Sequence, residues 1–238
     1  MQILDTCIGC GLCAPYCPVG AIVIEDDTAI INLDECVECG VCLKAGVCPT
    51  DSLAENENPS EARLLRQTFS NPRATHKSTN VLGRGTEEMK TNEVTNRFGR
   101  GVCGIAAELG RPGVGTRFYD VEKVAKACAK CGIEFEPYNP VTSLMTDKNT
   151  GAMNQEFINE KVLSAIVEFI CPNDKVVTVL KAIKEVSGEL ETVFSLEICC
   201  TAEEDGSFPM YDLLDDAGFT PSPNGKTNIG LGRLHLKL

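Results

Sequence analysis

Short apolar runs separated by polar turns begin near the N-terminus. The stretch AIVIEDDTAIINL, residues 21–33, has two β-prone runs on either side of Asp26 and Asp27, which predicts a β-hairpin. Farther along, SEARLLRQTF, residues 60–69, predicts a short helix capped by Ser60. The polar segment from there to about residue 100 has little periodicity, so we expect a linker or docking arm.

Two blocks in the C-terminal half share one pattern. Residues 104–137 and 164–198 each contain an apolar run, a turn, an amphipathic helix, a glycine and a second β-prone run. Two βαβ units in tandem predict an α+β fold, a βαββαβ sandwich with two helices on one face of an antiparallel sheet. This order is similar to the ferredoxin-like topology of ACT-like domains, a likeness of fold that implies nothing about clusters. The residues between the blocks are expected to be an insertion.

The helix of each block has predicted limits and an apolar stripe. We expect the first helix to be capped by Asp120 and to end at Gly132, and the second to run from Asn173 to Gly188. The apolar positions recur at helical spacing, which predicts the buried face of each helix. They are Val121, Val124, Cys128 and Cys131 in the first helix and Val176, Val179, Leu180, Ile183 and Val186 in the second.

Charge divides the chain into three parts. The net charge of the 238 residues is −12, which argues against general binding to nucleic acid or anionic membranes. Residues 1–59 carry 1 basic and 10 acidic residues, residues 60–117 carry 10 basic and 5 acidic residues, and residues 118–238 carry 11 basic and 19 acidic residues. This basic surplus suits docking on an acidic partner or phosphate, and a solvated linker is an equally good interpretation. The sequence lacks a recognisable signal peptide and an apolar run of about 18 residues, so we expect a cytoplasmic protein with reduced thiols.

Eight of the 14 cysteines form two runs that each end in Cys-Pro. Their positions are Cys7, Cys10, Cys13 and Cys17 in the first run and Cys36, Cys39, Cys42 and Cys48 in the second. Three thiolates spaced by two residues can surround one corner of a cubic cluster, and the fourth ligand must come from elsewhere. Zinc sites prefer paired C-x2-C groups, and disulfides conflict with the absent signal peptide. The spacing therefore predicts iron–sulfur clusters.

Residues 1–57 resemble a bacterial two-cluster [4Fe–4S] ferredoxin. In that family's signature the last cysteine of each run binds the other cluster. The resemblance implies that cluster 1 is held by Cys7, Cys10, Cys13 and Cys48, and cluster 2 by Cys36, Cys39, Cys42 and Cys17. It also implies one-electron transfer, because four cysteines leave no iron open to a substrate. The sequence departs from the pattern in the five-residue gap between Cys42 and Cys48.

The other cysteines, the histidines and several glutamates have simpler interpretations. Cys128 and Cys131 continue an apolar stripe, so we interpret them as structural thiols; the alternative is a further redox or metal site. Four other cysteines could join such a site: Cys103, Cys171, Cys199 and Cys200. The two histidines, His76 and His235, are expected to be exposed and not ligands. Four glutamates in strand-like runs are expected at solvated sheet edges: Glu134, Glu136, Glu168 and Glu197.

These patterns divide the chain into four segments. We expect a ferredoxin domain over residues 1–57, a basic arm over 58–100, the sandwich over 101–208 and an extension over 209–238. The leading hypothesis is an electron-transfer subunit that carries single low-potential electrons between a soluble donor and an oxidoreductase of anaerobic metabolism. Its expected partners are a catalytic oxidoreductase subunit and an electron donor or acceptor, with a homodimer through the sandwich as a further option. No catalytic residue is assigned.

Two alternatives belong to other functional classes. The sandwich could be a redox-linked sensor of a small ligand, as in ACT-like domains. Alternatively, the loop GRPGVGTRF could hold an anionic substrate for an enzyme, through Arg100, Arg111 and Arg117.

Overall fold

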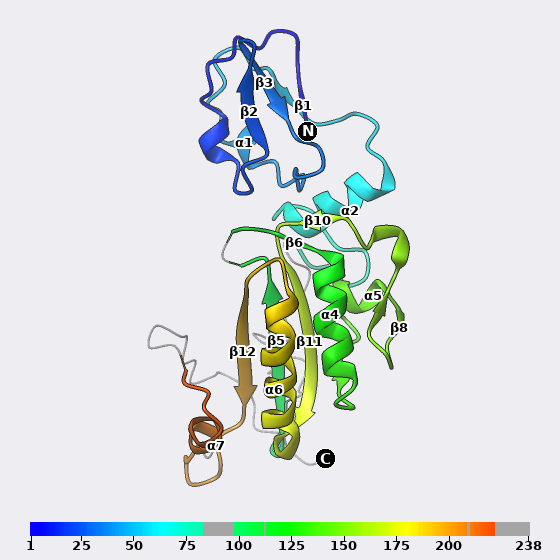
Figure 1. Cartoon of the computed structure of the whole chain (residues 1–238), viewed down its shortest axis with the longest axis vertical. Coiled ribbons are helices and arrows are strands. Elements are labelled where there is room, and N and C mark those ends of the chain that lie inside the picture. Colours follow the sequence, from blue (N-terminus) through cyan, green and yellow to red (C-terminus); the bar gives the residue numbers. More distant parts are fainter. Residues whose placement is uncertain (83–97, 112, 209, 222–238) are drawn as a thin grey trace.

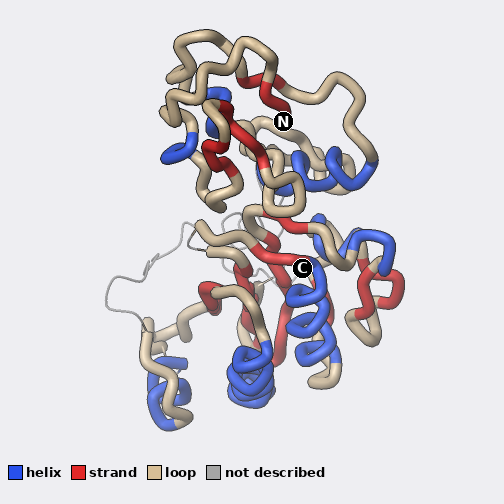
Figure 2. The backbone as a smooth tube through the Cα atoms, turned by 45° about the horizontal axis from the view of Figure 1, so that its top comes forward, coloured by secondary structure: helices blue, strands red, loops and turns tan. Residues whose placement is uncertain are grey.

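Two structural units lie end to end in the computed structural model, with one helix between them (Figure 1). The structure describes residues 1–82, 98–111, 113–208 and 210–221. Loops make up most of the N-terminal unit, whereas helices and strands dominate the C-terminal unit (Figure 2). None of the helices in these described parts is both long and apolar enough to cross a bilayer.

The N-terminal unit is built from very short elements. Strand β1 (Gln2–Ile3) pairs with β4 (Leu53–Ala54), and β2 (Ile22–Glu25) pairs with β3 (Thr28–Ile31), both antiparallel. Its helices are the 3-10 turn η1 (Ala14–Tyr16) and α1 (Val41–Lys44). The predicted hairpin is confirmed, and its turn residues Asp26 and Asp27 have φ values of 47° and 57°. Asp commonly tolerates this left-handed conformation, which matches the twist of a tight hairpin.

Helix α2 (Glu61–Ser70) connects the units. Its predicted cap is confirmed, because Ser60 Oγ accepts a hydrogen bond from the backbone N–H of Arg63 at 3.4 Å. Phe69 of α2 packs edge-to-face on Phe118 of the C-terminal core, with ring centroids 5.2 Å apart. This first part of the predicted basic arm is therefore an ordered helix. The centre of the arm lies outside the described residues.

A four-stranded sheet forms the C-terminal unit. Its strands are β5 (Val102–Leu109), β7 (Glu134–Phe135), β11 (Ala165–Pro172) and β12 (Phe194–Cys200). They lie in the order β12-β5-β11-β7, and each neighbouring pair is antiparallel. Helices α4 (Phe118–Ala129) and α6 (Val176–Val186) pack against each other on one face of the sheet (Figure 1). The mixed helix and strand content confirms the α+β class.

The predicted stripes of α4 and α6 form much of the core between helices and sheet. Val121, Val124 and Cys128 of α4 are fully buried there, as are Val176 and Val179 of α6. Burying aliphatic side chains of this size contributes about 1.5–3 kcal/mol each. Odd-numbered residues of β5 and β11 complete this core, because alternate strand residues share one face.

The remaining elements connect or extend the sheet. Between β7 and β11 lie α5 (Pro140–Ser143), β8 (Met145–Asp147), β9 (Ala152–Met153), η3 (Gln155–Phe157) and β10 (Lys161–Val162), which together make the predicted insertion. Strand β10 pairs with β6 (Thr116–Arg117), just before α4. The 3-10 turns η4 (Asn173–Lys175) and η5 (Ser187–Glu189) flank α6, and α7 (Met210–Asp216) follows β12.

The predicted cap of the first long helix is wrong. Helix α4 begins at Phe118, and the residue at its cap position, Arg117, makes no side-chain capping bond. Asp120 instead lies in the first turn, where its carboxylate accepts bonds from the Glu191 backbone N–H at 3.1 Å and from Lys123 at 2.9 Å. The Asp120 carboxylate, which was expected to cap the helix, thus binds the backbone of Glu191 instead.

Two expectations about polar exposure are also wrong. Glu136 and Glu168 are 1% and 2% exposed, not at solvated edges. Glu168 lies on the internal strand β11, where Asn139 donates to its carboxylate at 3.1 Å. Glu136 follows β7 and donates its backbone N–H to the carbonyl of Glu168 at 2.8 Å. His76 is 4% exposed and packs edge-to-face on Phe69, with centroids 4.7 Å apart. Burial lowers the pKa of His76 to about 4, so this imidazole is neutral at pH 7. His235 lies outside the described residues.

A group of cations on the C-terminal side binds one edge of the N-terminal unit. Arg66 of α2 donates to the carbonyls of Leu33 at 3.1 Å, Asp34 at 2.7 Å and Cys36 at 2.9 Å, and it pairs with Glu160. Arg117 binds both Asp34 and Glu35 at 2.7–2.8 Å, and Lys161 also pairs with Glu35. These bonds hold the pKa of the Asp34 and Glu35 carboxyls below their usual range.

We expect Arg66→Ala to lower the free energy of unfolding by about 2–4 kcal/mol, because the Glu160 carboxylate and the Asp34 carbonyl lose Arg66 as a donor, while the Leu33 and Cys36 carbonyls keep only Arg63. Denaturant unfolding followed by circular dichroism measures this loss. Arg100→Ala is the control, since Arg100 is 40% exposed and pairs with an 83% exposed Glu204. This control should change stability by less than about 0.5 kcal/mol. If Arg66→Ala and Arg100→Ala lowered the free energy of unfolding equally, the stabilising role of the buried Arg66 contacts would be contradicted.

Candidate iron–sulfur sites

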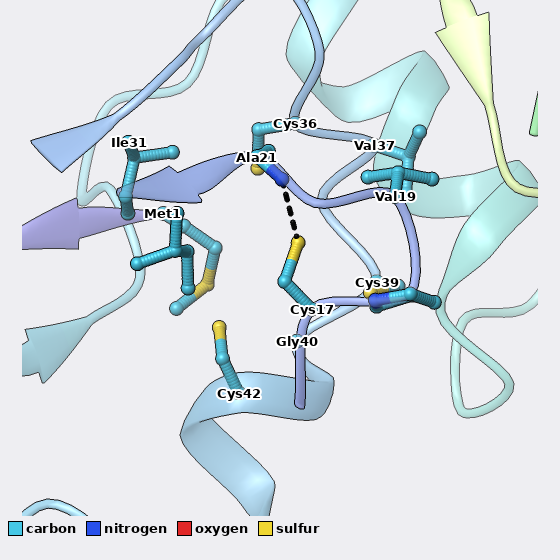
Figure 3. A pocket seen from close by; sticks show the side chains of 12 residues that line it. Met1, Cys17, Val19, Ala21, Ile31, Cys36, Val37, Cys39, Gly40 and Cys42 are labelled. Carbon is cyan, nitrogen blue, oxygen red and sulfur yellow. Dashed lines mark hydrogen bonds between the residues drawn. The ribbon is translucent and has the colours of Figure 1, made fainter. Parts of the chain in front are cut away.

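Two cavities in the N-terminal unit are lined by cysteines. The first, here called the Cys17 cavity, has four thiols on its wall: Cys17, Cys36, Cys39 and Cys42. Figure 3 shows these side chains around one space, with Cys42 on α1 and Cys17 on the segment that leads into β2. Apolar side chains complete the wall, among them Val19 and Ile31.

The second, here called the Cys48 cavity, also has four thiols: Cys7, Cys10, Cys13 and Cys48. Backbone N–H groups point at two of these sulfur atoms. Ser52 donates to Cys48 Sγ at 3.2 Å, and Ala29 donates to Cys7 Sγ at 3.4 Å. In the Cys17 cavity, Ala21 donates to Cys17 Sγ at 3.1 Å (Figure 3). Such bonds stabilise a sulfur atom that carries negative charge.

Each cavity therefore combines three thiols of one sequence run with the last cysteine of the other run. The hairpin β2–β3 follows Cys17 directly, and the loop after α1 leads to Cys48. The five-residue gap between Cys42 and Cys48 contains the end of α1 and the turn at Gly46, whose φ is +63°. The two additional residues of this gap are thus accommodated in a turn, and Cys48 still lies in the Cys48 cavity with the cysteines of the first run.

The local backbone that bends the cysteines around each cavity depends on glycine. Gly9, between Cys7 and Cys10, has φ +62°, and a Cβ there would lie 2.4 Å from the backbone of Asp27. Gly40, between Cys39 and Cys42, has φ +69° and occupies the cap position of α1. Other residue types adopt this left-handed conformation at a cost, and at Gly9 a side chain would also collide with the hairpin.

The donor sets fit [4Fe–4S] clusters, each of which is held by four cysteine thiolates. The two cavities are alike in that four cysteine side chains line each of them. Burial raises the pKa of the Cys36 and Cys39 thiols, and that of Cys42 to about 11. These thiols ionise readily only when a metal stabilises the thiolate.

The two cavities differ in their surroundings. Beside the Cys48 cavity, Cys10 is exposed, and the flanking Ile8 and Leu12 are 59% and 52% exposed. In the Cys17 cavity, three of the thiols are buried. The carbonyl of Cys36 accepts bonds from Arg63 at 3.0 Å and from Arg66 at 2.9 Å, so this cavity lies beside the C-terminal side of the molecule. No sequence motif marks Arg63 and Arg66, but their spacing by three residues on one predicted helix places both on the same helix face.

The three arginines proposed for anion binding do not converge in the structure. Arg100 pairs with Glu204, Arg111 with Glu108 at 2.8 Å, and Arg117 with Asp34 and Glu35 of the N-terminal unit. Each guanidinium is thus engaged by a carboxylate of the chain itself. An anion contact at these residues stays a prediction.

We expect Gly9→Ala to remove about half of the bound iron, because the Cβ collision with Asp27 displaces the Cys7–Cys10 loop from the Cys48 cavity. Iron and sulfide analysis of anaerobically purified protein measures the loss. Gly20→Ala is the matched control: its φ is +64°, yet no atom lies within 4 Å of the added Cβ. Full iron content in Gly9→Ala, or an equal loss in Gly20→Ala, would contradict this account.

Comparison with known proteins assigns the N-terminal unit. Residues 6–52 match the family model of the 4Fe-4S dicluster domain. The ferredoxin-like protein in the vnf region of Azotobacter vinelandii is 48% identical over 48 residues, which are 19% of this chain and 74% of that protein. Ferredoxin-2 of Chlorobaculum tepidum is 36% identical over 58 residues, 22% of this chain and 90% of that protein.

Ferredoxin-1 of Caulobacter vibrioides is 31% identical over 67 residues, which are 27% of this chain and 58% of that protein. These relatives and the dicluster model establish two [4Fe–4S] clusters as the cofactors. All of these matches are short relative to the chain, so they say nothing about most of its length. By its N-terminal unit, the chain belongs to the family of 4Fe–4S dicluster ferredoxins.

Proposed function

We propose that this protein is an electron-transfer subunit that passes single low-potential electrons between a soluble donor and a partner oxidoreductase of anaerobic metabolism in the cytoplasm. The observation that carries the proposal is the pair of cavities, each lined by four thiols. Ligation by four cysteines leaves no iron open to a substrate, so the clusters serve to take up and release electrons.

In this proposal each cavity's four thiols are the ligands of one cluster. Cluster 1 is bound by Cys7, Cys10, Cys13 and Cys48, and cluster 2 by Cys36, Cys39, Cys42 and Cys17. The N–H···S bonds to Cys48, Cys7 and Cys17 orient three of these ligands and stabilise their charge. Backbone donors lower the pKa of Cys48 in the same way.

The Cys48 cavity is the proposed point of exchange with a partner. Ile8 and Leu12 form an exposed apolar surface beside Cys10. Asp26 and Asp27, at the exposed tip of the β2–β3 hairpin, lie against the Gly9 loop and add negative charge beside it. An apolar centre with an acidic border suits a partner whose docking site is apolar and bordered by Lys or Arg.

The C-terminal unit, which we interpret as a βαββαβ sandwich, is the proposed attachment to the catalytic partner. Arg66, on the connecting helix α2, donates to the carbonyl of Cys36 in the wall of the Cys17 cavity. Electrons would therefore pass between the Cys48 cavity and a partner bound to the C-terminal unit by way of the Cys17 cavity, in either direction. The alternatives are a small-ligand sensor that binds its ligand at the ACT-like sandwich and an enzyme that holds an anionic substrate through Arg100, Arg111 and Arg117. Their existing carboxylate partners favour the electron-transfer reading. Turnover of a metabolite by the isolated chain would contradict it.

We expect Cys48→Ser to bind only one cluster, because the Cys48 cavity loses its fourth thiolate. The variant should hold about four irons instead of about eight and take up about one electron instead of about two per chain. Iron analysis and a reductive titration followed by electron paramagnetic resonance measure both values. Cys131→Ser is the control, because that half-buried thiol lies outside both cavities. Iron loss in the control, or none in Cys48→Ser, would contradict the ligand assignment.

We expect Asp26→Lys with Asp27→Lys to slow electron transfer to a basic protein acceptor, such as cytochrome c, about tenfold at low salt. The rate of the unaltered protein should also fall as ionic strength rises. Stopped-flow measurement with the prereduced chain gives both rates. The control is a pair of equal charge changes on α6 and η5, Glu185→Lys with Glu189→Lys. A similar slowing by the control would contradict docking at the hairpin.

A further inference from the structure

Four of the six cysteines outside the two cavities gather at one end of the C-terminal sheet. Cys103 is near the start of β5, Cys171 is near the end of β11, and Cys199 and Cys200 end β12. In Figure 1 this end of the sheet points away from the N-terminal unit. The electron-transfer proposal uses none of these thiols.

Three of these cysteines form one row across adjacent strands. Cys103 on β5 is directly opposite Cys171 on β11 and directly opposite Cys200 on β12. Opposed residues of antiparallel strands have Cα atoms about 4.5–5.5 Å apart, and a disulfide requires about 4.4–6.8 Å. All three side chains face the helix-covered core. The typical Cα spacing of opposed residues is therefore compatible with a disulfide from Cys103 to either neighbour.

The two neighbours of Cys103 have different environments. Cys171 is fully buried on an internal strand, and its thiol donates to the carbonyl of Pro172 at 3.2 Å. Cys200 is only half-buried and lies on the edge strand β12, so a small solute reaches it more easily. Cysteines that react with peroxide are generally accessible to solvent and often lie next to a second, resolving cysteine.

The thiol–thiol contact also makes the pair unequal. A hydrogen bond from Cys103 lowers the pKa of Cys200, whereas the bond to Cys200, followed by burial, raises the pKa of Cys103. Asn173 Oδ1 is a second acceptor for the Cys103 thiol, at 3.0 Å. Because Cys200 is half-buried on the edge strand and Cys103 is fully buried, a solute from solvent meets Cys200 first, and Cys103 can react only with a neighbour.

We propose that Cys200 and Cys103 form a hydroperoxide-reactive dithiol site, in which Cys200 is the attacking thiol and Cys103 the resolving thiol. The Cys200 thiolate attacks one peroxide oxygen and forms an S–O bond while the O–O bond breaks. The other oxygen takes up a proton and leaves as water or an alcohol. Cys103 then attacks the sulfur of the resulting sulfenic acid, so that the S–S bond forms and the S–O bond breaks. The hydroxyl group leaves as water with the proton of the Cys103 thiol. The two thiols lose two electrons in total, and the hydroperoxide gains them.

The product is a cross-strand disulfide that ties the edge strand β12 to the central strand β5. Because these strands are already paired in this register, the bond requires no refolding. A thiol reductant returns the site to its dithiol state. This site is independent of which cysteines hold the clusters, since it shares no residue with either cavity.

The test is a titration of the cluster-loaded full chain with up to one equivalent of hydrogen peroxide under anaerobic conditions. Free thiols are then alkylated, and peptide mass spectrometry identifies linked cysteines, while iron content reports on the clusters. We expect a Cys103–Cys200 linkage that a thiol reductant reverses. The linkage should fall at least tenfold in Cys200→Ser and persist in the matched controls Cys199→Ser and Cys171→Ser.

Three outcomes would overturn the proposal. One is a linkage of Cys103 to Cys171 or Cys199 in place of Cys200. Another is peroxide consumption that leaves Cys103 and Cys200 reduced while iron is lost. The third is an undiminished Cys103 linkage in Cys200→Ser, with circular dichroism verifying that this variant is folded.

Discussion

The exchange of a fourth cysteine between the two sequence runs is the constraint on which the N-terminal unit depends. Three thiols spaced by two residues reach one side of a cluster, so each run requires a thiol from the other. Cys17 and Cys48 cross over in this way, which ties the first loop to the last one. This explains how a unit with strands of two to four residues keeps a defined shape, because cluster binding supplements its small apolar core.

The two cavities differ in the charged residues around them. Asp34 and Glu35, beside the Cys17 cavity, are paired with Arg117 and Lys161 from the C-terminal side. Asp26 and Asp27 remain exposed on the hairpin near the Cys48 cavity. One acidic edge of the N-terminal unit is thus neutralised by cations of the same chain, whereas the other faces solvent. In the proposed function, a partner of complementary charge docks at the solvent-facing edge.

Local patterns predicted much of the fold because they depend on neighbours in sequence. The β2–β3 hairpin follows from Asp26 and Asp27, and helix α2 from Ser60, both through backbone geometry within a few residues. The failures share another cause. Asp120 meets a distant backbone N–H, and Glu168 lies on a strand whose neighbours on both sides come from elsewhere in the chain. Such partners cannot be read from periodicity.

The sequence by itself determined the cofactors and the elements that hold them, because cysteine spacing and glycine placement are local properties. Only the tertiary structure decided which cavity faces the C-terminal side, through Arg63 and Arg66, whose acceptors lie about thirty residues away. It also decided that Cys103 lies between Cys171 and Cys200. Strand pairing brings together residues about seventy to one hundred positions apart, and no local spacing encodes that register.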